Sequence, residues 1–146
     1  MQLSTVGRYA LRAMVDLAQH RDQEPVQRKD IAARQEISND YLAQLFLKLK
    51  KAKLVESVRG PGGGYVLAQS ATEISAGDVL RAVEESIRPV HCVENGQDER
   101  CTRADGCPTR VLWARLGDAV VRVLDSTTLA ELCEEPARLA KDDAIL

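Results

Sequence analysis

Residues 30–68 read DIAARQEISNDYLAQLFLKLKKAKLVESVRGPGGGYVLA, and this stretch decides the fold. Ile31, Ala32 and Ile37 supply the apolar side of a short first helix and its turn. A second helix is predicted after Ser38, whose hydroxyl can accept a backbone N–H of the first turn. In it, four apolar residues fall at the i, i+3, i+4 and i+7 spacing of one buried stripe: Leu42, Leu45, Phe46 and Leu49. The pattern predicts a helix-turn-helix.

The opposite face of the second helix is polar or small, with Asn39, Asp40, Ala43, Gln44, Lys48 and Lys51. Amide side chains can read base edges in a DNA major groove, and lysines can contact phosphates. A merely solvated surface is the ordinary alternative for a lysine-bearing helix face.

Two short strands are predicted next, over 54–58 and 65–67, joined by RGPGGG at 59–64. Gly60, Gly62, Gly63 and Gly64 permit positive φ and a close backbone approach, and Pro61 stiffens the turn. No Gly-Lys-Ser/Thr follows, which excludes a phosphate-binding P-loop. Arg59, at the base of this wing, can enter a minor groove or bind a phosphate. Helix, turn, polar helix and Arg-bearing wing in this order favour DNA binding.

Length and composition fit one domain, or one domain with an appendage. The chain has 146 residues, of which 45% are hydrophobic and only 3% aromatic. The core should therefore be aliphatic, and base stacking on an aromatic platform is not expected. No apolar run is long enough to span a membrane, and no signal-peptide pattern opens the chain. We expect a cytoplasmic protein with no membrane partner, whose four cysteines stay reduced.

The net charge of −2 conceals an asymmetry between the two halves of the chain. Residues 1–70 hold 11 Lys/Arg against 7 Asp/Glu, whereas residues 71–146 hold 9 against 15. The positive half contains the predicted helix-turn-helix, as expected for a protein that offers one face to a polyanion.

Three regions are predicted: a winged helix-turn-helix domain over 1–75, a cysteine loop with dimerisation helices over 76–133, and a flexible tail over 134–146. The first region begins with a helix over 2–20. The second begins with a helix that a Ser75/Asp78 capping box opens and that runs to about Ser86. The fold class is thus mainly α with a small β-wing.

The most apolar helix is predicted over 109–125, with Pro108 in its first turn. Its stripe is long for so small a fold, so part of it should pack against a second copy of the chain. Packing on its own core alone is the alternative. The stripe comprises Val111, Leu112, Leu116, Ala119, Val120, Val123 and Leu124. A capping box at Thr128/Glu131 predicts a last short helix.

A loop without apolar periodicity contains three cysteines in the spacing C-x8-C-x5-C. They are Cys92, Cys101 and Cys107. No C-x2-C or H-x3-H pair is present, which argues against a zinc finger. Wide spacing in a loop suits a larger object such as an iron–sulfur cluster held by thiolates. A bare redox-thiol loop and an adventitious zinc site remain open. Cys133, apart from the three, is expected to be a buried small hydrophobe.

These residues resemble the iron–sulfur-cluster regulator family of winged-helix transcription factors, and most of all its branch of iron–sulfur cluster assembly regulators. The similar stretches are GRYALRAMVDLA at 7–18, ISNDYLAQLFLKLKKAKLVESVRGPGGGYVLA at 37–68, and the three-cysteine loop leading into a Trp-bearing helix. The resemblance extends to about residue 133. It implies a homodimer whose helices 109–125 cross.

The resemblance also implies sites. Cys92, Cys101 and Cys107 match the ligands of a cluster, commonly [2Fe-2S]. Ser38, Tyr41, Gln44 and Arg59 match positions that face DNA. With the neighbouring polar and glycine positions, the predicted DNA-binding set is Ser38, Asn39, Tyr41, Gln44, Lys48, Arg59, Gly60, Gly62 and Gly63.

Two positions depart from the family pattern. Arg110 stands three residues after the last cysteine, where the assembly-regulator branch usually has a histidine. Arg8 stands where a nitric-oxide-sensing branch has an acidic residue. His91 therefore becomes a fourth-ligand candidate, although it adjoins Cys92. The other candidates are Asp98, Glu99, Asp105, a group of the partner chain and an exogenous thiol.

The function expected is that of a homodimeric regulator, not an enzyme. It would bind a roughly palindromic operator in double-stranded DNA, act as a repressor of iron–sulfur cluster biogenesis genes, and sense cluster status through its cysteines. Ala43, on the exposed helix face, has no polar side chain that would exclude a DNA site at that position. The cluster-free form should therefore still bind some sites. The alternatives are sensing of nitric oxide or oxidants through the cluster or bare thiols, and a redox or cluster-carrier protein whose winged helix binds only protein.

Overall fold

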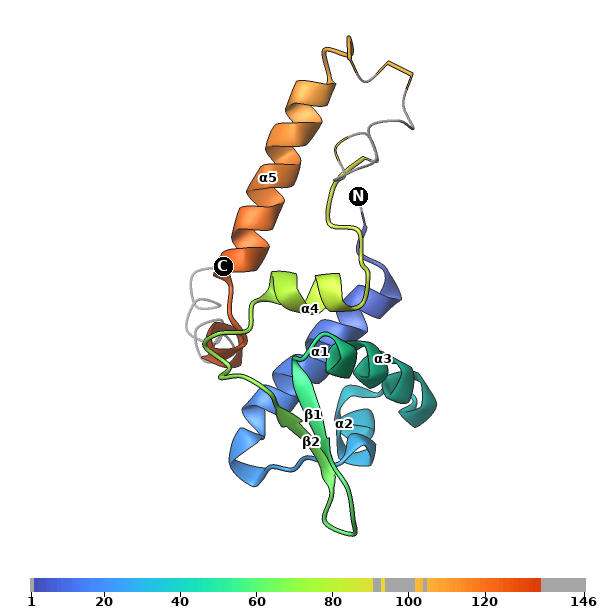
Figure 1. The fold of residues 1–146 in the computed structure, drawn as a ribbon, viewed down its shortest axis with the longest axis vertical. Helices are drawn as coiled ribbons and strands as arrows, with labels where there is room; N and C mark the ends of the chain where they lie inside the picture. The colour runs from blue at the N-terminus through green and yellow to red at the C-terminus, as the bar shows by residue number, and fades with distance from the viewer. Residues whose placement is uncertain (1, 91–92, 94–101, 104, 135–146) are drawn as a thin grey trace, which may run out of the picture.

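The computed structural model describes residues 2–90, 93, 102–103 and 105–134. Its elements, in chain order, are α1 (Thr5–Gln19), a 3-10 turn (Arg21–Gln23), α2 (Arg28–Gln35), α3 (Asn39–Lys51), β1 (Val55–Val58), β2 (Gly64–Leu67), α4 (Ala76–Ala82) and α5 (Arg110–Ser126). Figure 1 shows α1 to α4 packed together, the two-stranded wing extending from them, and α5 rising away on the other side. The predicted mainly α fold with a β-wing is confirmed. Within the described residues, no helix is long and apolar enough to cross a membrane.

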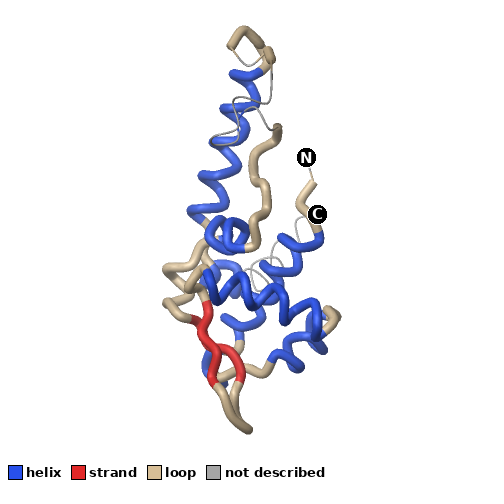
Figure 2. The backbone as a smooth tube through the Cα atoms, turned by 45° about the vertical axis from the view of Figure 1, so that its right-hand side comes forward, coloured by secondary structure: helices blue, strands red, loops and turns tan. Residues whose placement is uncertain are grey.

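The core lies where α1, α2, α3, α4 and the base of the wing meet. Apolar residues of α1 and the predicted stripe of α3 are fully or almost fully buried in it: Ala10, Ala13, Met14, Leu17, Leu42, Leu45, Phe46 and Leu49. Ile31 of α2 and Ile37 of the turn are also buried. The two strands pair antiparallel, with Val55 opposite Leu67 and Val58 opposite Gly64. The red hairpin in Figure 2 extends below the helices, so its turn is held out from the core.

The predicted helix ends need small corrections. Ser75 and Asp78 form the expected capping box, but α4 ends at Ala82 rather than near Ser86. The reason is Glu84, whose φ of 59° is left-handed and cannot continue a helix. Pro108 is not in the first turn of α5, because Thr109 is the N-cap and Arg110 begins the helix. Thr128 and Glu131 exchange the two capping-box hydrogen bonds, as predicted.

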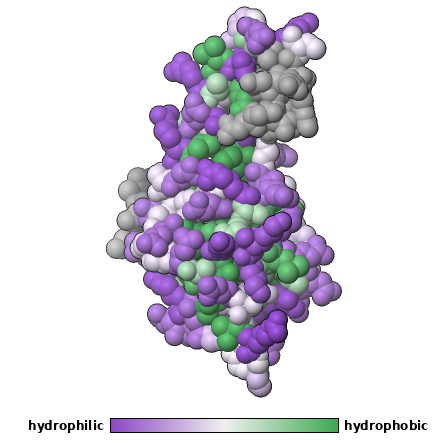
Figure 3. Space-filling view, viewed as in Figure 1, coloured by the Kyte–Doolittle hydropathy of each residue, from purple (hydrophilic) through white to green (hydrophobic). Residues whose placement is uncertain are grey.

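Helix α5 joins the rest of the described molecule near its middle, where Arg88 Nη1 donates to Asp118 Oδ1 at 2.7 Å, and at its C-terminal end. At the C-terminal end, Nη2 of Arg81, in α4, donates to both carboxylate oxygens of Asp125, at 2.6 and 2.7 Å. A Cβ on Gly77 would overlap that carboxylate, so glycine permits the approach. Figure 3 shows apolar surface interrupting the polar coat along this arm.

The apolar stripe of α5 is only partly covered by the described residues. Val111, Leu112 and Val123 are 65%, 54% and 63% exposed, and Gly117 is the one buried residue of the helix. The described residues do not decide between packing on its own core alone, the alternative weighed for this helix, and packing against a partner. A second copy of the chain is still the prediction for what covers it.

Candidate DNA interface and cysteine segment

The N-terminal end of α3 is held by α1. Ser38 caps it as predicted, accepting the backbone N–H of Tyr41 at 3.1 Å. The Tyr41 ring meets Tyr9 of α1 edge to face, with 5.8 Å between centroids, and the Arg12 guanidinium lies over Tyr9. These contacts fix the helix start and leave Ser38, Asn39 and Gln44 exposed to a ligand.

A ring stack fixes the wing relative to α3. Phe46, on the buried side of α3, stacks on Tyr65 of β2 with centroids 4.2 Å apart and planes 17° apart. Because Phe46 is fully buried, a change in the wing position must disturb the core. The two surfaces predicted to meet DNA thus move as one unit.

The wing turn requires glycine at two of the predicted positions. Gly60 has a φ of 109°, and a Cβ on Gly63 would overlap the carbonyl of Val58. Gly62 has open space around its Cβ position and is not sterically required. Arg59 is exposed at the start of the turn. The structure is therefore compatible with a DNA contact by Arg59, and that contact remains a prediction.

Lys48 has a partner that the sequence pattern did not indicate. Its Nζ lies 3.6 Å from a carboxylate oxygen of Glu84, just after α4, and both side chains are well exposed. An exposed pair of this kind contributes only about 0–1 kcal/mol. A DNA phosphate could replace Glu84, so the predicted phosphate contact of Lys48 stays open.

Two basic residues next to the wing were missed from sequence. Arg28 and Lys29 open α2, and the Arg28 Nε–H donates to Asn39 Oδ1 at 2.8 Å. The sequence does show two adjacent cations at the start of the first helix of the helix-turn-helix. It does not show the tertiary contact with Asn39, because that contact joins residues eleven positions apart.

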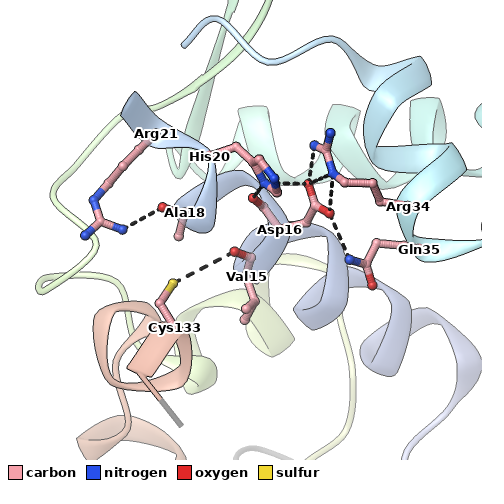
Figure 4. A network of polar contacts seen from close by, with 8 residues as sticks. All are labelled: Val15, Asp16, Ala18, His20, Arg21, Arg34, Gln35 and Cys133. Atoms are coloured by element: carbon pink, nitrogen blue, oxygen red, sulfur yellow. Dashed lines mark hydrogen bonds and ion pairs between the residues drawn. The ribbon is translucent and has the colours of Figure 1, made fainter. Parts of the chain in front are cut away.

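A buried carboxylate was also missed. Asp16, on the inner side of α1, is 1% exposed and accepts from Arg34 Nη2 at 2.6 Å and from Gln35 Nε2 at 2.8 Å. His20 lies on its other side (Figure 4). The carboxylate raises the pKa of Arg34 through this hydrogen bond. The network ties α1 to the end of α2 and so supports the helix-turn-helix.

Of the three loop cysteines, Cys107 lies in the described part. It is half-exposed, and its Sγ is 3.1 Å from Thr109 Oγ1. Hydrogen bonds from the Thr109 hydroxyl and backbone lower the pKa of this thiol, and the positive charge of Arg103 lowers it further. An accessible thiol with a lowered pKa is a suitable ligand for iron.

The other predicted ligands, Cys92, Cys101 and His91, lie outside the described residues, as do Asp98 and Glu99. Asp105 is described and exposed. Among the described residues, no group of three or more His, Cys, Asp and Glu side chains is placed to hold a metal ion. The ligand set therefore remains a prediction.

Cys133 has the opposite environment. Its Sγ is 3.9 Å from the Val15 carbonyl oxygen, and it packs against the core (Figure 4). Burial raises the pKa of this thiol. Cys133 thus packs as a small hydrophobic residue, as predicted. It is half-buried rather than fully buried.

The two thiols should therefore differ in reactivity. In reduced, metal-free protein near neutral pH, iodoacetamide should alkylate Cys107 well before Cys133, because only the thiolate attacks and its fraction is larger where the pKa is lowered. Peptide mass spectrometry over a time course measures both rates. Raising the pH should reduce the difference between the two alkylation rates. Equal rates near neutral pH would contradict the assigned environments of the two thiols.

Known proteins resemble this chain over most of its length. The model of the Rrf2 family, described as iron-dependent transcriptional regulators, matches residues 3–135. The HTH-type transcriptional regulators IscR of Pectobacterium carotovorum subsp. carotovorum and of Serratia proteamaculans are each 48% identical over 132 residues, covering 90% of this chain and 79% of theirs.

Two solved structures are similar in sequence and fold. CymR, the global cysteine regulator of B. subtilis, has a TM-score of 0.76 and 41% identity, covering 92% of this chain and 98% of its own. IscR of T. potens has a TM-score of 0.76 and 38% identity, covering 93% and 88%. These relatives are named regulators rather than enzymes. The chain therefore belongs to the Rrf2 family of DNA-binding transcription regulators.

Proposed function

We propose that the protein is a cytoplasmic homodimeric repressor that senses iron–sulfur cluster status and controls cluster biogenesis genes. One observation carries this proposal. The polar face of α3 and the Arg59-bearing wing are held together by the Phe46–Tyr65 stack, while Cys107, a thiol with a lowered pKa, lies three residues before the partly exposed helix α5.

For DNA, the proposal assigns the major groove to the start of α3 and the adjacent minor groove to the wing. Ser38, Tyr41 and Gln44 would face base edges and phosphates, and Arg59 would enter the minor groove. The glycines of the turn would let the wing backbone approach the duplex. Two copies of this unit require a roughly palindromic operator.

For the dimer, the proposal uses the partly exposed stripe of α5. The double change Leu112→Glu and Val123→Glu should raise the dimer dissociation constant roughly 100-fold or more, because burying each such side chain contributes about 1.5–3 kcal/mol. Sedimentation equilibrium measures it. Leu47→Glu is the matched control, since Leu47 is a 68% exposed leucine on α3. A double variant that dimerises like this control would contradict the assignment.

For the sensor, Cys92, Cys101 and Cys107 would hold the cluster, which we propose to be [2Fe-2S]. The fourth ligand would come from His91, Asp98, Glu99, Asp105, the partner chain or an exogenous thiol. When bound, the cluster would supply a redox-active and labile iron centre. Cys107 lies three residues before Arg110, which begins α5. A cluster bound through Cys107 would therefore act on the proposed dimer helix. A tenfold change in DNA affinity requires only about 1.4 kcal/mol.

Anaerobic purification tests the sensor assignment, with an absorption spectrum and iron and sulfide counts. A coloured protein with matching iron and sulfide supports the cluster. A colourless, iron-free protein would favour a second candidate, a regulator that senses oxidants through bare thiols. The lowered pKa of Cys107 is the observation that favours this second candidate.

A salt titration tests the DNA assignment. The affinity for a duplex selected by the protein from a randomised pool should fall steeply with salt, because cations that neutralise phosphates release counterions. Binding no tighter than to random DNA would instead support the cluster-carrier alternative, in which the winged helix binds only protein.

A further inference from the structure

A cleft of about 300 Å³ lies between the start of α2, the start of α3 and the wing turn. Arg28 and Lys29 contribute two cations to its lining, and no carboxylate is among the lining residues. Asn39 and the glycines Gly60 and Gly63 supply amide and bare backbone surface. The cleft is thus electropositive, polar and open to a small anionic group.

The cleft has a rigid frame. Val26, just before α2, exchanges two backbone hydrogen bonds with Tyr65 of β2, at 2.9 and 2.8 Å. The backbone N–H of Leu67 also donates to a Glu24 carboxylate oxygen, at 3.1 Å. A Cβ on Gly64 would overlap the Val26 carbonyl, so glycine permits the close approach. These hydrogen bonds therefore hold the start of α2 against the wing.

Arg28 is held in position by Asn39. Its Nε–H donates to Asn39 Oδ1 at 2.8 Å, and no other hydrogen bond or ion pair engages the guanidinium within the described residues. The two terminal nitrogens therefore keep their donors for a ligand. A guanidinium can bind a phosphate with two parallel hydrogen bonds. Asn39 spends one of the two acceptor positions of its side-chain oxygen on this contact.

The geometry of a duplex identifies the ligand. If α3 enters a major groove and the wing the adjacent minor groove, the sugar–phosphate strand that separates these grooves must pass between the two elements. We infer that this cleft binds a backbone phosphate of that strand, with Arg28 and Lys29 as its cations. Asn39 is then a positioning residue that acts through Arg28 rather than a reader of bases. The inference rests on the proposed DNA binding.

The first test compares charge removals. The probe is a fluorescein-labelled duplex selected on the wild-type protein from a randomised pool, titrated at several salt concentrations. Arg28→Gln and Lys29→Gln should each reduce the slope of log affinity against log salt by about 1 per bound copy, and weaken binding equally on all sequence variants of the duplex. Lys53→Gln is the matched control, because Lys53 is exposed at the other end of the hairpin. It should leave the slope unchanged.

The second test concerns Asn39. Asn39→Ala should weaken binding by the same factor on the selected duplex and on its single-base variants. In the Arg28→Gln background, the same change should cost little more, because residues in one hydrogen-bonded unit are not additive. A merely structural role would lower stability without this dependence on Arg28, so urea unfolding of each variant is measured in parallel.

The possible outcomes distinguish a failure of the phosphate cleft from a failure of the proposed DNA binding. A slope unchanged by both Arg28→Gln and Lys29→Gln overturns the phosphate cleft while leaving DNA binding intact. Relaxed preference at one base pair in Asn39→Ala, with effects that add to those of Arg28→Gln, overturns the positioning role. If selection yields no duplex bound better than random DNA, the proposed function fails and the cleft fails with it.

Discussion

Replacing Phe46 with alanine should lower the free energy of unfolding by about 4 kcal/mol, within the range of about 3–5 kcal/mol for removing a buried Phe. Phe46 is fully buried and stacks on Tyr65, so the change opens a cavity and also detaches the wing from α3. Urea denaturation followed by far-ultraviolet circular dichroism measures the loss.

Leu47 supplies the matched control for this prediction. It adjoins Phe46 on α3 but is 68% exposed, so Leu47→Ala should change the free energy of unfolding by only about 0.5 kcal/mol or less. If Phe46→Ala costs no more than Leu47→Ala, the stack does not hold the wing, and the argument that both DNA-facing surfaces move as one unit fails.

Replacing Arg34 with methionine should cost about 3 kcal/mol, near the low end of the range for removing one partner of a buried pair. The Asp16 carboxylate, at 1% exposure, would lose its cationic partner and be left with Gln35 and His20 beside it (Figure 4). The Arg34 side chain is itself 36% exposed, which favours the lower figure. Urea denaturation near neutral pH measures this loss.

Two further variants separate charge from packing at this site. Arg34→Lys keeps the charge but not the double hydrogen bond, so it should lose less than methionine does. Adding Asp16→Leu to Arg34→Met should recover part of the loss, because no charge is then left buried. A double variant less stable than Arg34→Met alone would show that the burial of Asp16 is not the cause.

Alkali should not remove the contribution of Arg34. A raised folded-state pKa means that the stabilisation is complete below the pKa of the unfolded state and is lost only as the pH rises through the higher folded value. Since Asp16 raises the pKa of Arg34 above the already high ordinary one, the pair persists through ordinary alkaline conditions.

The helix-turn-helix was predictable because its signals are local. The spacing of Leu42, Leu45, Phe46 and Leu49 identified the buried side of α3, and Ser38 and Ser75 marked helix starts that the structure confirms. Each of these signals acts within one or two turns of helix. The glycine turn likewise carries its own conformational requirement, at Gly60 and Gly63.

What could not be predicted depends on contacts between distant parts of the chain. Nothing in one sequence pairs Arg28 with Asn39, Arg34 with Asp16 or Lys48 with Glu84. The end of α4 was also missed, because residues 83–86 carry no proline or glycine that would stop a helix, and the left-handed Glu84 follows from the path of the chain. The apolar stripe of α5 predicted a second copy of the chain as its partner, and that partner remains a prediction.

The central claim is that the cysteine segment sets DNA affinity. The most direct measurement compares cluster-loaded wild-type protein, the same protein after anaerobic cluster removal, and Cys107→Ser, all on one selected duplex at fixed salt, with iron and sulfide counts for each sample. We expect the loaded and cluster-free forms to differ by about tenfold or more, or about 1.4 kcal/mol. Cys107→Ser should behave like the cluster-free form, and both should keep measurable binding to some sites. Equal affinities in all three samples, with the cluster verified in the first, would contradict the account.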